Sequence, residues 1–218
     1  VRYEPGVSVG GTGSRFGLSG FTIRGIGGNR VLTLVDGIRI PDEFSFGPFL
    51  SARRDFVDVD TIERVEIARG PVSTLYGSDA LGGVVAITTR APNDYVSADD
   101  PLHLEAKTGY SSEDESFIAA VNGAYGNEDV ALMLNYTNRT GSETETSGSV
   151  GGTGPTRSQA DPQDLKTETI GAKIAVRVSP HHNLIAGYEV YDSTVETTLL
   201  SDFGTVARGA VTNTRNTE

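Results

Sequence analysis

The stretch TIERVEIARGPVSTLYGSDALGGVVAITTR, residues 61–90, divides the chain into two unlike halves. Within it, residues 65–69 and 84–89 are rich in β-branched side chains and are flanked by Gly-Pro and Gly-Gly pairs, which predicts two strands. Glycine- and arginine-rich segments with turn signals precede the stretch, and long alternating segments follow it. We therefore expect two domains, over residues 1–95 and 96–218.

The two halves also differ in charge. Residues 1–95 contain ten arginines, no lysine and eleven acidic residues, whereas residues 96–218 contain eight basic and eighteen acidic residues. The second half thus carries almost all of the net charge of −11, which argues against nucleic acid as a partner, because a phosphate backbone requires a basic face. Arginine without lysine is typical of paired or partly buried guanidinium groups.

Short strands are expected before residue 61. Residues 31–35 are predicted to form a buried strand, and Asp36-Gly37 a two-residue hairpin turn that leads into residues 38–40. Asp36 is interpreted as a turn residue and not as a catalytic carboxylate, because Asp tolerates the positive φ of such a turn. With the two strands of the central stretch, these elements predict a small α/β unit of about four strands.

One loop in the first half is a candidate ligand-facing segment. Residues 41–55, PDEFSFGPFLSARRD, bring Phe44, Phe46 and Phe49 close together with few neighbours that could bury them. Aromatic residues on a loop either fold back onto the domain or contact a ligand, and the sequence leaves both open.

No metal site and no catalytic site is expected. Asp55, Asp58 and Asp60 lack the glycine and glutamate positions of a calcium loop. His181 and His182 are adjacent, so on a strand their side chains would point to opposite faces. No nucleophile, base and orienting group stand at a recognisable spacing, and we therefore do not expect an enzyme.

The second half contains five segments of about ten residues in which apolar and polar side chains alternate: 102–110, 117–125, 130–136, 170–178 and 184–190. This period of two is typical of the strands of a membrane β-barrel. Residues 126–129 and 179–183 are predicted tight turns, whereas residues 140–165 form a long polar loop, as in barrels with short periplasmic and long outside connections. A soluble all-β sandwich or meander alternates in the same way and remains the other interpretation.

Two stretches resemble the signature segments of the plug domain of TonB-dependent outer-membrane receptors. They are IRGIGGNRVLTLVDGIRI, residues 23–40, and IERVEIARGPVSTLYGSDALGGVVAITTR, residues 62–90. The order of a plug followed by alternating strands is also the order of that family. The resemblance implies an α+β plug domain with a small mixed sheet, followed by about the first five strands of an incomplete transmembrane β-barrel, in the outer membrane of a Gram-negative bacterium.

Residues 50–90 are most similar to the branch of this family that takes up haem from haem, haemoglobin or related host proteins. The resemblance implies part of a transporter for haem or a haem-carrying protein, energised through TonB. A siderophore or cobalamin receptor of the same class and a soluble β-rich binding module are the alternatives. No resident cofactor is expected, since haem would be the transported ligand, and none of the three histidines, His103, His181 and His182, lies in the plug.

The resemblance also implies partners and contacts. The partners are TonB, outer-membrane lipid, and haem, a haem protein or another iron chelate. Arg24 and Arg69 match arginines that in the family pair with glutamates on the inner barrel wall, so they are expected to form plug–barrel contacts. A bidentate ion pair in a wet lumen can hold the plug and still be rearranged under load. The chain is expected to be an internal part of a longer receptor, since five strands cannot close a barrel.

Overall fold

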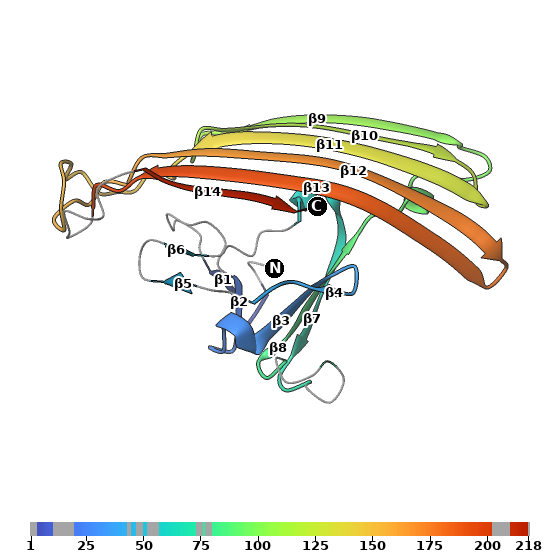
Figure 1. Cartoon of the computed structure of the whole chain (residues 1–218), viewed down its shortest axis with the longest axis horizontal. Coiled ribbons are helices and arrows are strands. Elements are labelled where there is room, and N and C mark those ends of the chain that lie inside the picture. The colour runs from blue at the N-terminus through green and yellow to red at the C-terminus, as the bar shows by residue number, and fades with distance from the viewer. Residues whose placement is uncertain are drawn as a thin grey trace. The chain divides into compact units, whose positions relative to one another are not determined.

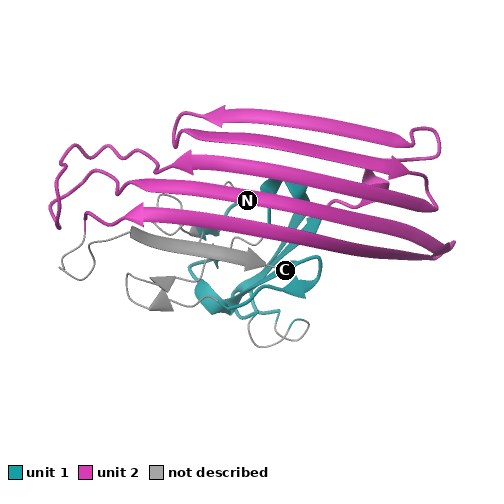
Figure 2. Cartoon of the chain, turned by 45° about the horizontal axis from the view of Figure 1, so that its top comes forward, with its two compact units in different colours: residues 1–89 teal, residues 90–218 magenta. Residues whose placement is uncertain are grey.

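The structure is a computed structural model, which describes residues 4–10, 20–42, 45–46, 50–51, 57–72, 76, 80–201 and 210–217. The chain divides into two compact units, residues 1–89 and residues 90–218, coloured teal and magenta in Figure 2. The division falls between Thr89 and Arg90, shortly before the expected boundary at Tyr95. Each unit has its own sheet and its own core.

A four-stranded mixed sheet forms the centre of the first unit, in the order β4-β3-β8-β7. Its strands are β3 (Val31–Val35), β4 (Ile38–Arg39), β7 (Ile62–Arg69) and β8 (Gly83–Thr89). Strand β8 pairs in parallel with β3 and antiparallel with β7, and it is the most buried of the four. The predicted strands and the small mixed sheet are therefore confirmed, and β7 begins earlier than predicted.

Shorter elements complete the first unit. Strand β1 (Val7–Gly10) pairs with β2 (Gly20–Ile23), and β5 (Ser45–Phe46) pairs with β6 (Leu50–Ser51). The predicted loop over residues 41–55 therefore includes a short strand pair. Two 3-10 turns are described in this unit, η1 (Gly28–Arg30) and η2 (Val59–Thr61). One core cluster consists of Val7, Ile23, Val31, Val85 and Ile87, and a second consists of Leu32, Ala80 and Val84. In the part of the chain that the structure describes, no helix is long and apolar enough to span a membrane.

The second unit is a single antiparallel sheet of six long strands, each paired with the next along the chain (Figure 1). The strands are β9 (Leu102–Ser111), β10 (Ser116–Gly126), β11 (Val130–Ser142), β12 (Gln163–Ser179), β13 (His182–Thr198) and β14 (Ala210–Thr217).

The five predicted segments are all strands, but two expectations need correction. The sheet has six strands and not about five, because β14, AVTNTRNT, lacks the apolar alternation by which the others were recognised. The long loop covers residues 143–162 and not 140–165, because β11 and β12 both continue past their apolar parts. The ladder of backbone hydrogen bonds extends a strand beyond the residues that its side-chain pattern marks.

One face of this sheet is apolar and exposed. Cross-strand pairing places Tyr125 opposite Leu132 and Leu132 opposite Ile174, and the same alignment continues along the strands. The exposed apolar side chains on this face include Leu102, Leu104, Tyr110, Phe117, Val121, Tyr125, Val130, Leu132, Leu134, Tyr136, Ile170, Ile174, Leu184 and Tyr188. The opposite face carries polar side chains such as Glu105, Asn122 and Asn135. An apolar outer face with a polar inner face is the arrangement of a membrane barrel wall.

The apolar band crosses the strands at a slant. It reaches Tyr110 on β9, but the residue in the same cross-strand row of β12 is Lys166, and the band on β12 begins only at Ile170. Between β9 and β12 the edge of the band therefore shifts by four residues along the strand, from the row of Lys166 to Ile170, which is about 13 Å. The three strand spacings from β9 to β12 total about 14 Å. The strands are therefore tilted by roughly 40° to the band, as they are in closed barrels.

Candidate functional site

Both arginines that were predicted to contact a barrel wall contact residues that precede β1. The guanidinium of Arg69, at the end of β7, forms an ion pair with the carboxylate of Glu4. The amide of Arg24 donates a hydrogen bond to the carbonyl oxygen of Gly6 over 2.7 Å. Arg24 also has a φ of 50°, which is uncommon for a residue other than glycine. The sequence did not suggest Glu4 as a partner, and the contact of either arginine with a barrel wall stays a prediction.

The candidate ligand-facing loop is only partly covered by the structure. Phe46 lies in β5, whereas Phe44 and Phe49 fall outside the described residues. Contact of these three aromatic residues with a ligand therefore stays a prediction. Within the described ranges, no three His, Asp or Glu side chains are grouped so that they could hold a metal ion.

Asp36 has a second role that the sequence did not reveal. Its φ of 48° and the φ of 80° at Gly37 form the predicted tight turn. Its carboxylate also accepts a hydrogen bond from the amide of Thr89 over 2.8 Å and a second from the hydroxyl of Thr89. The turn after β3 is thus bound to the last residue of β8, where the first unit ends.

We expect Asp36→Ala to loosen this end of the sheet by about 1–3 kcal/mol, because the buried donors of Thr89 lose their acceptor. In the complete receptor, hydrogen exchange at the Thr89 amide should become faster. Asp36→Asn is the matched control, since it keeps an acceptor oxygen and tolerates positive φ. Exchange that is equally slow in Asp36→Ala and in the wild type would contradict this role.

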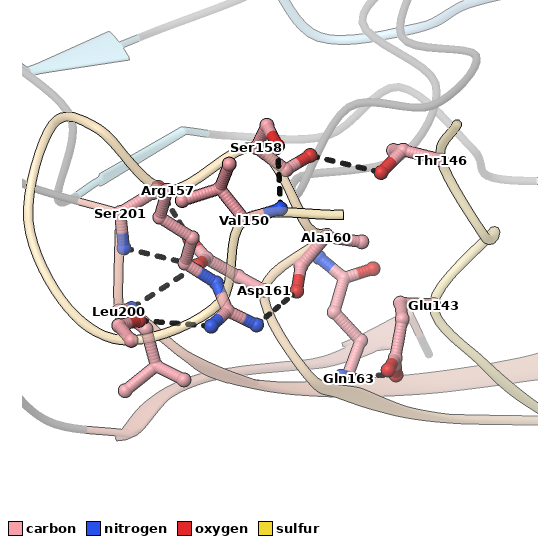
Figure 3. A network of polar contacts seen from close by, with 11 residues as sticks. Glu143, Thr146, Val150, Arg157, Ser158, Ala160, Asp161, Gln163, Leu200 and Ser201 are labelled. Atoms are coloured by element: carbon pink, nitrogen blue, oxygen red, sulfur yellow. Dashed lines mark hydrogen bonds and ion pairs between the residues drawn. The ribbon is translucent and has the colours of Figure 1, made fainter. Parts of the chain in front are cut away.

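The loop over residues 143–162, which we call the β11–β12 loop, is organised around the ion pair of Arg157 and Asp161 (Figure 3). Arg157 Nε lies 3.4 Å from Asp161 Oδ1, and the two side chains are 8% and 4% exposed. The guanidinium also donates hydrogen bonds to the carbonyl oxygens of Gly152 and Ala160, over 2.9 and 2.7 Å. The loop is therefore built on a buried pair of charges and is not merely a polar linker.

Asp161 also connects this loop to the residues that follow β13. Its Oδ1 accepts hydrogen bonds from the amides of Leu200 and Ser201, over 3.1 and 3.0 Å, and its Oδ2 accepts one from the Ser201 hydroxyl over 2.7 Å. In the other direction, the amide of Gly154 donates to the carbonyl oxygen of Leu200. The β11–β12 loop is thereby joined to the first residues that follow β13.

The turn between β9 and β10 meets the β11–β12 loop at this end as well. The amide of Glu145 in this loop donates a hydrogen bond to the carbonyl oxygen of Glu113 over 3.3 Å, and the amide of Ser142, the last residue of β11, donates one to the carbonyl oxygen of Asp114 over 2.8 Å. Burial opposes ionisation of the Asp114 carboxyl group, but hydrogen bonds from Ser116 and Ser111 outweigh it and hold its pKa below the usual value. Asp114 is therefore an anion at neutral pH that stabilises its own turn.

The first residues of the second unit lie on the polar face of the sheet. Arg90 donates a hydrogen bond to the Tyr95 hydroxyl over 2.9 Å, and this contact raises the pKa of the guanidinium. Lys173 on β12 donates to the carbonyl oxygen of Arg90 over 3.2 Å. The neighbouring Val96 is buried in a cluster with Ala124, Ala131 and Met133. The connection that precedes β9 is thus fixed to the inner face of this unit.

A small mixed-sheet unit followed by a tilted sheet with an apolar outer face defines the class of plugged outer-membrane receptors. Residues 1–84 match the model of the TonB-dependent receptor plug domain, and the chain belongs to the TonB-dependent receptor family. This is a family of receptors and transporters that form β-barrels in the outer membrane.

Relatives with known names match both units. A probable hemoglobin and hemoglobin-haptoglobin-binding protein 4 of Haemophilus influenzae is 32% identical over 206 residues, which cover 88% of this chain and 20% of that protein. Hemoglobin-haptoglobin utilization protein B of Neisseria meningitidis serogroup C is 39% identical over 157 residues, which cover 66% of this chain and 19% of that protein. The chain thus spans about a fifth of the length of these relatives.

Solved structures support the fold. The siderophore receptor PirA from Acinetobacter baumannii has a TM-score of 0.62 at 23% identity, over 92% of this chain and 29% of that one. The FrpB iron transporter from Neisseria meningitidis, F3-3 variant, has a TM-score of 0.66 at 19% identity, over 88% of this chain and 28% of that one. At these identities the similarity concerns the fold alone.

Proposed function

We propose that this chain is the plug and the first strands of a receptor that takes up haem from haemoglobin or another haem-carrying protein, driven through TonB. The observation that carries the proposal is the identity of 32–39% to two relatives named for hemoglobin and hemoglobin-haptoglobin binding or utilization. The siderophore receptor with a similar fold is only 23% identical, so uptake of a ferric siderophore is the second candidate. Haem is cargo in this proposal and not a resident cofactor.

Two features of the structure agree with this function. The exposed apolar band on β9 to β13 fits outer-membrane lipid, because a water-exposed apolar patch of this extent is rare in soluble proteins. The ion pair of Arg69 with Glu4 joins the end of β7 to the residues that precede β1, on the N-terminal side from which a pull transmitted by TonB would arrive. Such a pull would therefore put force on this ion pair.

The test is growth of a Gram-negative host that lacks its own haem receptors and carries the complete receptor. We expect growth with haemoglobin as the only iron source, loss of growth when TonB is deleted, and recovery of the protein in the outer-membrane fraction. Growth on a ferric siderophore but not on haemoglobin or haemin would favour the second candidate. Recovery only from the periplasm or the medium would reject the transporter and favour a soluble binding module.

A further inference from the structure

We propose that residues 90–101, which we call the connecting segment, are a fixed anchor of the chain on the polar face of the second unit. Lys173 and Tyr95 are the positioning residues that hold the segment there. The proposal rests on the proposed function in one respect, transport driven by a pull through TonB, and it applies to any cargo. A pull on the first unit is then resisted at Arg90, where the second unit begins.

The connecting segment lies on an apolar patch of a face that elsewhere carries polar side chains such as Asn122. Ala124 follows Asn122 by two positions on β10 and is paired with Met133 on β11, so these side chains share one face. Ala124, Ala131 and Met133 are at most 3% exposed, and Val96 of the connecting segment, 5% exposed, completes their cluster. The segment is therefore packed against the sheet, because its apolar side chain is removed from water there.

Hydrogen bonds and a ring contact join the connecting segment to the two outer strands of this region. Lys173 on β12 donates from Nζ to the carbonyl oxygen of Arg90 over 3.2 Å, and Arg90 donates to the Tyr95 hydroxyl over 2.9 Å. The rings of Tyr95 and of His103 on β9 lie 4.6 Å apart between their centroids. With the cluster on β10 and β11, the segment contacts four neighbouring strands (Figure 1), a width of about 14 Å.

The side chain of Lys173 is itself held in place by a glycine on the next strand. Its cross-strand neighbour on β13 is Gly187. A Cβ atom on Gly187 would lie 3.0 Å from Lys173 Cγ and 3.6 Å from Lys173 Cε, so the aliphatic stem of Lys173 lies over Gly187. A packed stem leaves the ammonium group fewer conformations to lose when it binds Arg90.

The connecting segment also has little free length of its own. It contains the 3-10 turn η3 (Pro92–Asp94), which is closed by a hydrogen bond of 2.6 Å from the amide of Ala91 to Asp94 Oδ2. A second turn follows, in which the amide of Ser97 donates to the carbonyl oxygen of Asp100 over 2.9 Å. A flexible linker lengthens before it transmits force. This segment transmits force to the sheet directly, since its turns and its contacts are already formed.

A covalent lock tests whether the segment stays in place during transport. In the complete receptor, Val96→Cys and Met133→Cys place two thiols in one buried cluster, and this chain has no cysteine of its own. Dibromobimane, a short reagent that becomes fluorescent when both its arms have reacted, joins the two thiols. A fixed anchor does not have to leave the sheet, so we expect uptake of radiolabelled haem from haemoglobin to stay within twofold of the untreated double variant. A loss of uptake greater than fivefold on crosslinking overturns the proposal.

Weakening the anchor tests the two positioning residues. Lys173→Met keeps the packed stem and removes the donor to Arg90, and Tyr95→Phe keeps the ring and removes the acceptor of Arg90. We expect each variant to lower uptake about fivefold, as the loss of one hydrogen bond would, with haemoglobin binding within twofold of the wild type. The crosslink between residues 96 and 133 should restore at least half of the uptake of Lys173→Met. Unchanged uptake in both variants overturns the proposal, and so does a loss that the crosslink does not restore, since a merely structural defect would persist.

Lys166→Met is the matched control. Lys166 lies on the same strand as Lys173, but its side chain is 62% exposed and pairs with Glu168 on the opposite face of the sheet. Its uptake should stay within twofold of the wild type, and a loss equal to that of Lys173→Met overturns the role of Lys173. A wild-type receptor that takes up no haem from haemoglobin overturns the proposed function and not the anchor, which the same variants then test with the ferric siderophore that supports growth.

Discussion

Gly83→Ala is expected to prevent assembly of the plug, with a cost of several kcal/mol. Gly83 begins the central strand β8 with a φ of +145°, and a Cβ atom there would lie 2.3 Å from the carbonyl oxygen of Ala68 and 2.8 Å from Ile23 Cδ1. Ala68 O belongs to the backbone of the paired strand β7, so it cannot move without breaking the sheet. Backbone strain and overpacking each cost about 1–3 kcal/mol, a large share of the stability of a small domain.

The measurement is protection of the plug from trypsin in outer-membrane vesicles that contain the complete receptor, together with growth on haemoglobin. Gly25→Ala is the matched control, since Gly25 also has a positive φ, +82°, but a Cβ atom there would meet nothing within 4 Å. Its cost should be only the conformational one of about 1–2 kcal/mol, and growth should persist. If both variants resist trypsin equally, the close packing of β8 against β7 is not the reason why residue 83 is glycine.

Arg69→Ala is expected to lower uptake of radiolabelled haem at least tenfold, while haemoglobin binding stays within twofold of the wild type. The guanidinium contacts Glu4, which precedes β1, and the resemblance to the family implies a second partner on the barrel wall. Either contact would be under force while TonB pulls on the plug, but neither belongs to the candidate ligand-facing loop over residues 41–55. Unchanged uptake would contradict both roles.

Two further variants separate the partners of Arg69. Glu4→Gln removes the ion pair within the plug and leaves the arginine in place, so a loss of uptake equal to that of Arg69→Ala would identify Glu4 as the partner that matters. Uptake like the wild type would assign the effect to the wall contact. Arg64→Ala is the matched control, because Arg64 lies on the same strand and pairs only with its sequence neighbours Glu63 and Glu66 among the described ion pairs.

The strands were the most predictable part of this molecule. A strand with one lipid-facing side repeats apolar residues at every second position, so β9 to β13 could be read from local sequence. Strand β14 was not predicted, because its sequence is polar and only its pairing with β13 makes it a strand. The lengths of β11 and β12 were underestimated for the same reason.

The candidate site was less predictable. Arg24 and Arg69 were recognised by resemblance, but Glu4, the partner of Arg69, was not. The Arg157–Asp161 pair was missed, although its spacing of four residues is a signal, because in a glycine-rich loop that spacing implies no fixed geometry.

The sequence by itself determined the order of the two units, the period of their strands and the turn at Asp36, because these depend on neighbouring residues. The tertiary structure alone decided which distant residues meet. Thr89 reaches Asp36 across 53 positions, and Leu200 reaches Asp161 across 39. A hydrogen bond or an ion pair depends on where the fold brings two groups together, and separation along the chain does not specify that position. The tertiary structure also decides that residue 83 must be glycine, because the backbone of β7 lies too close to it for a Cβ atom.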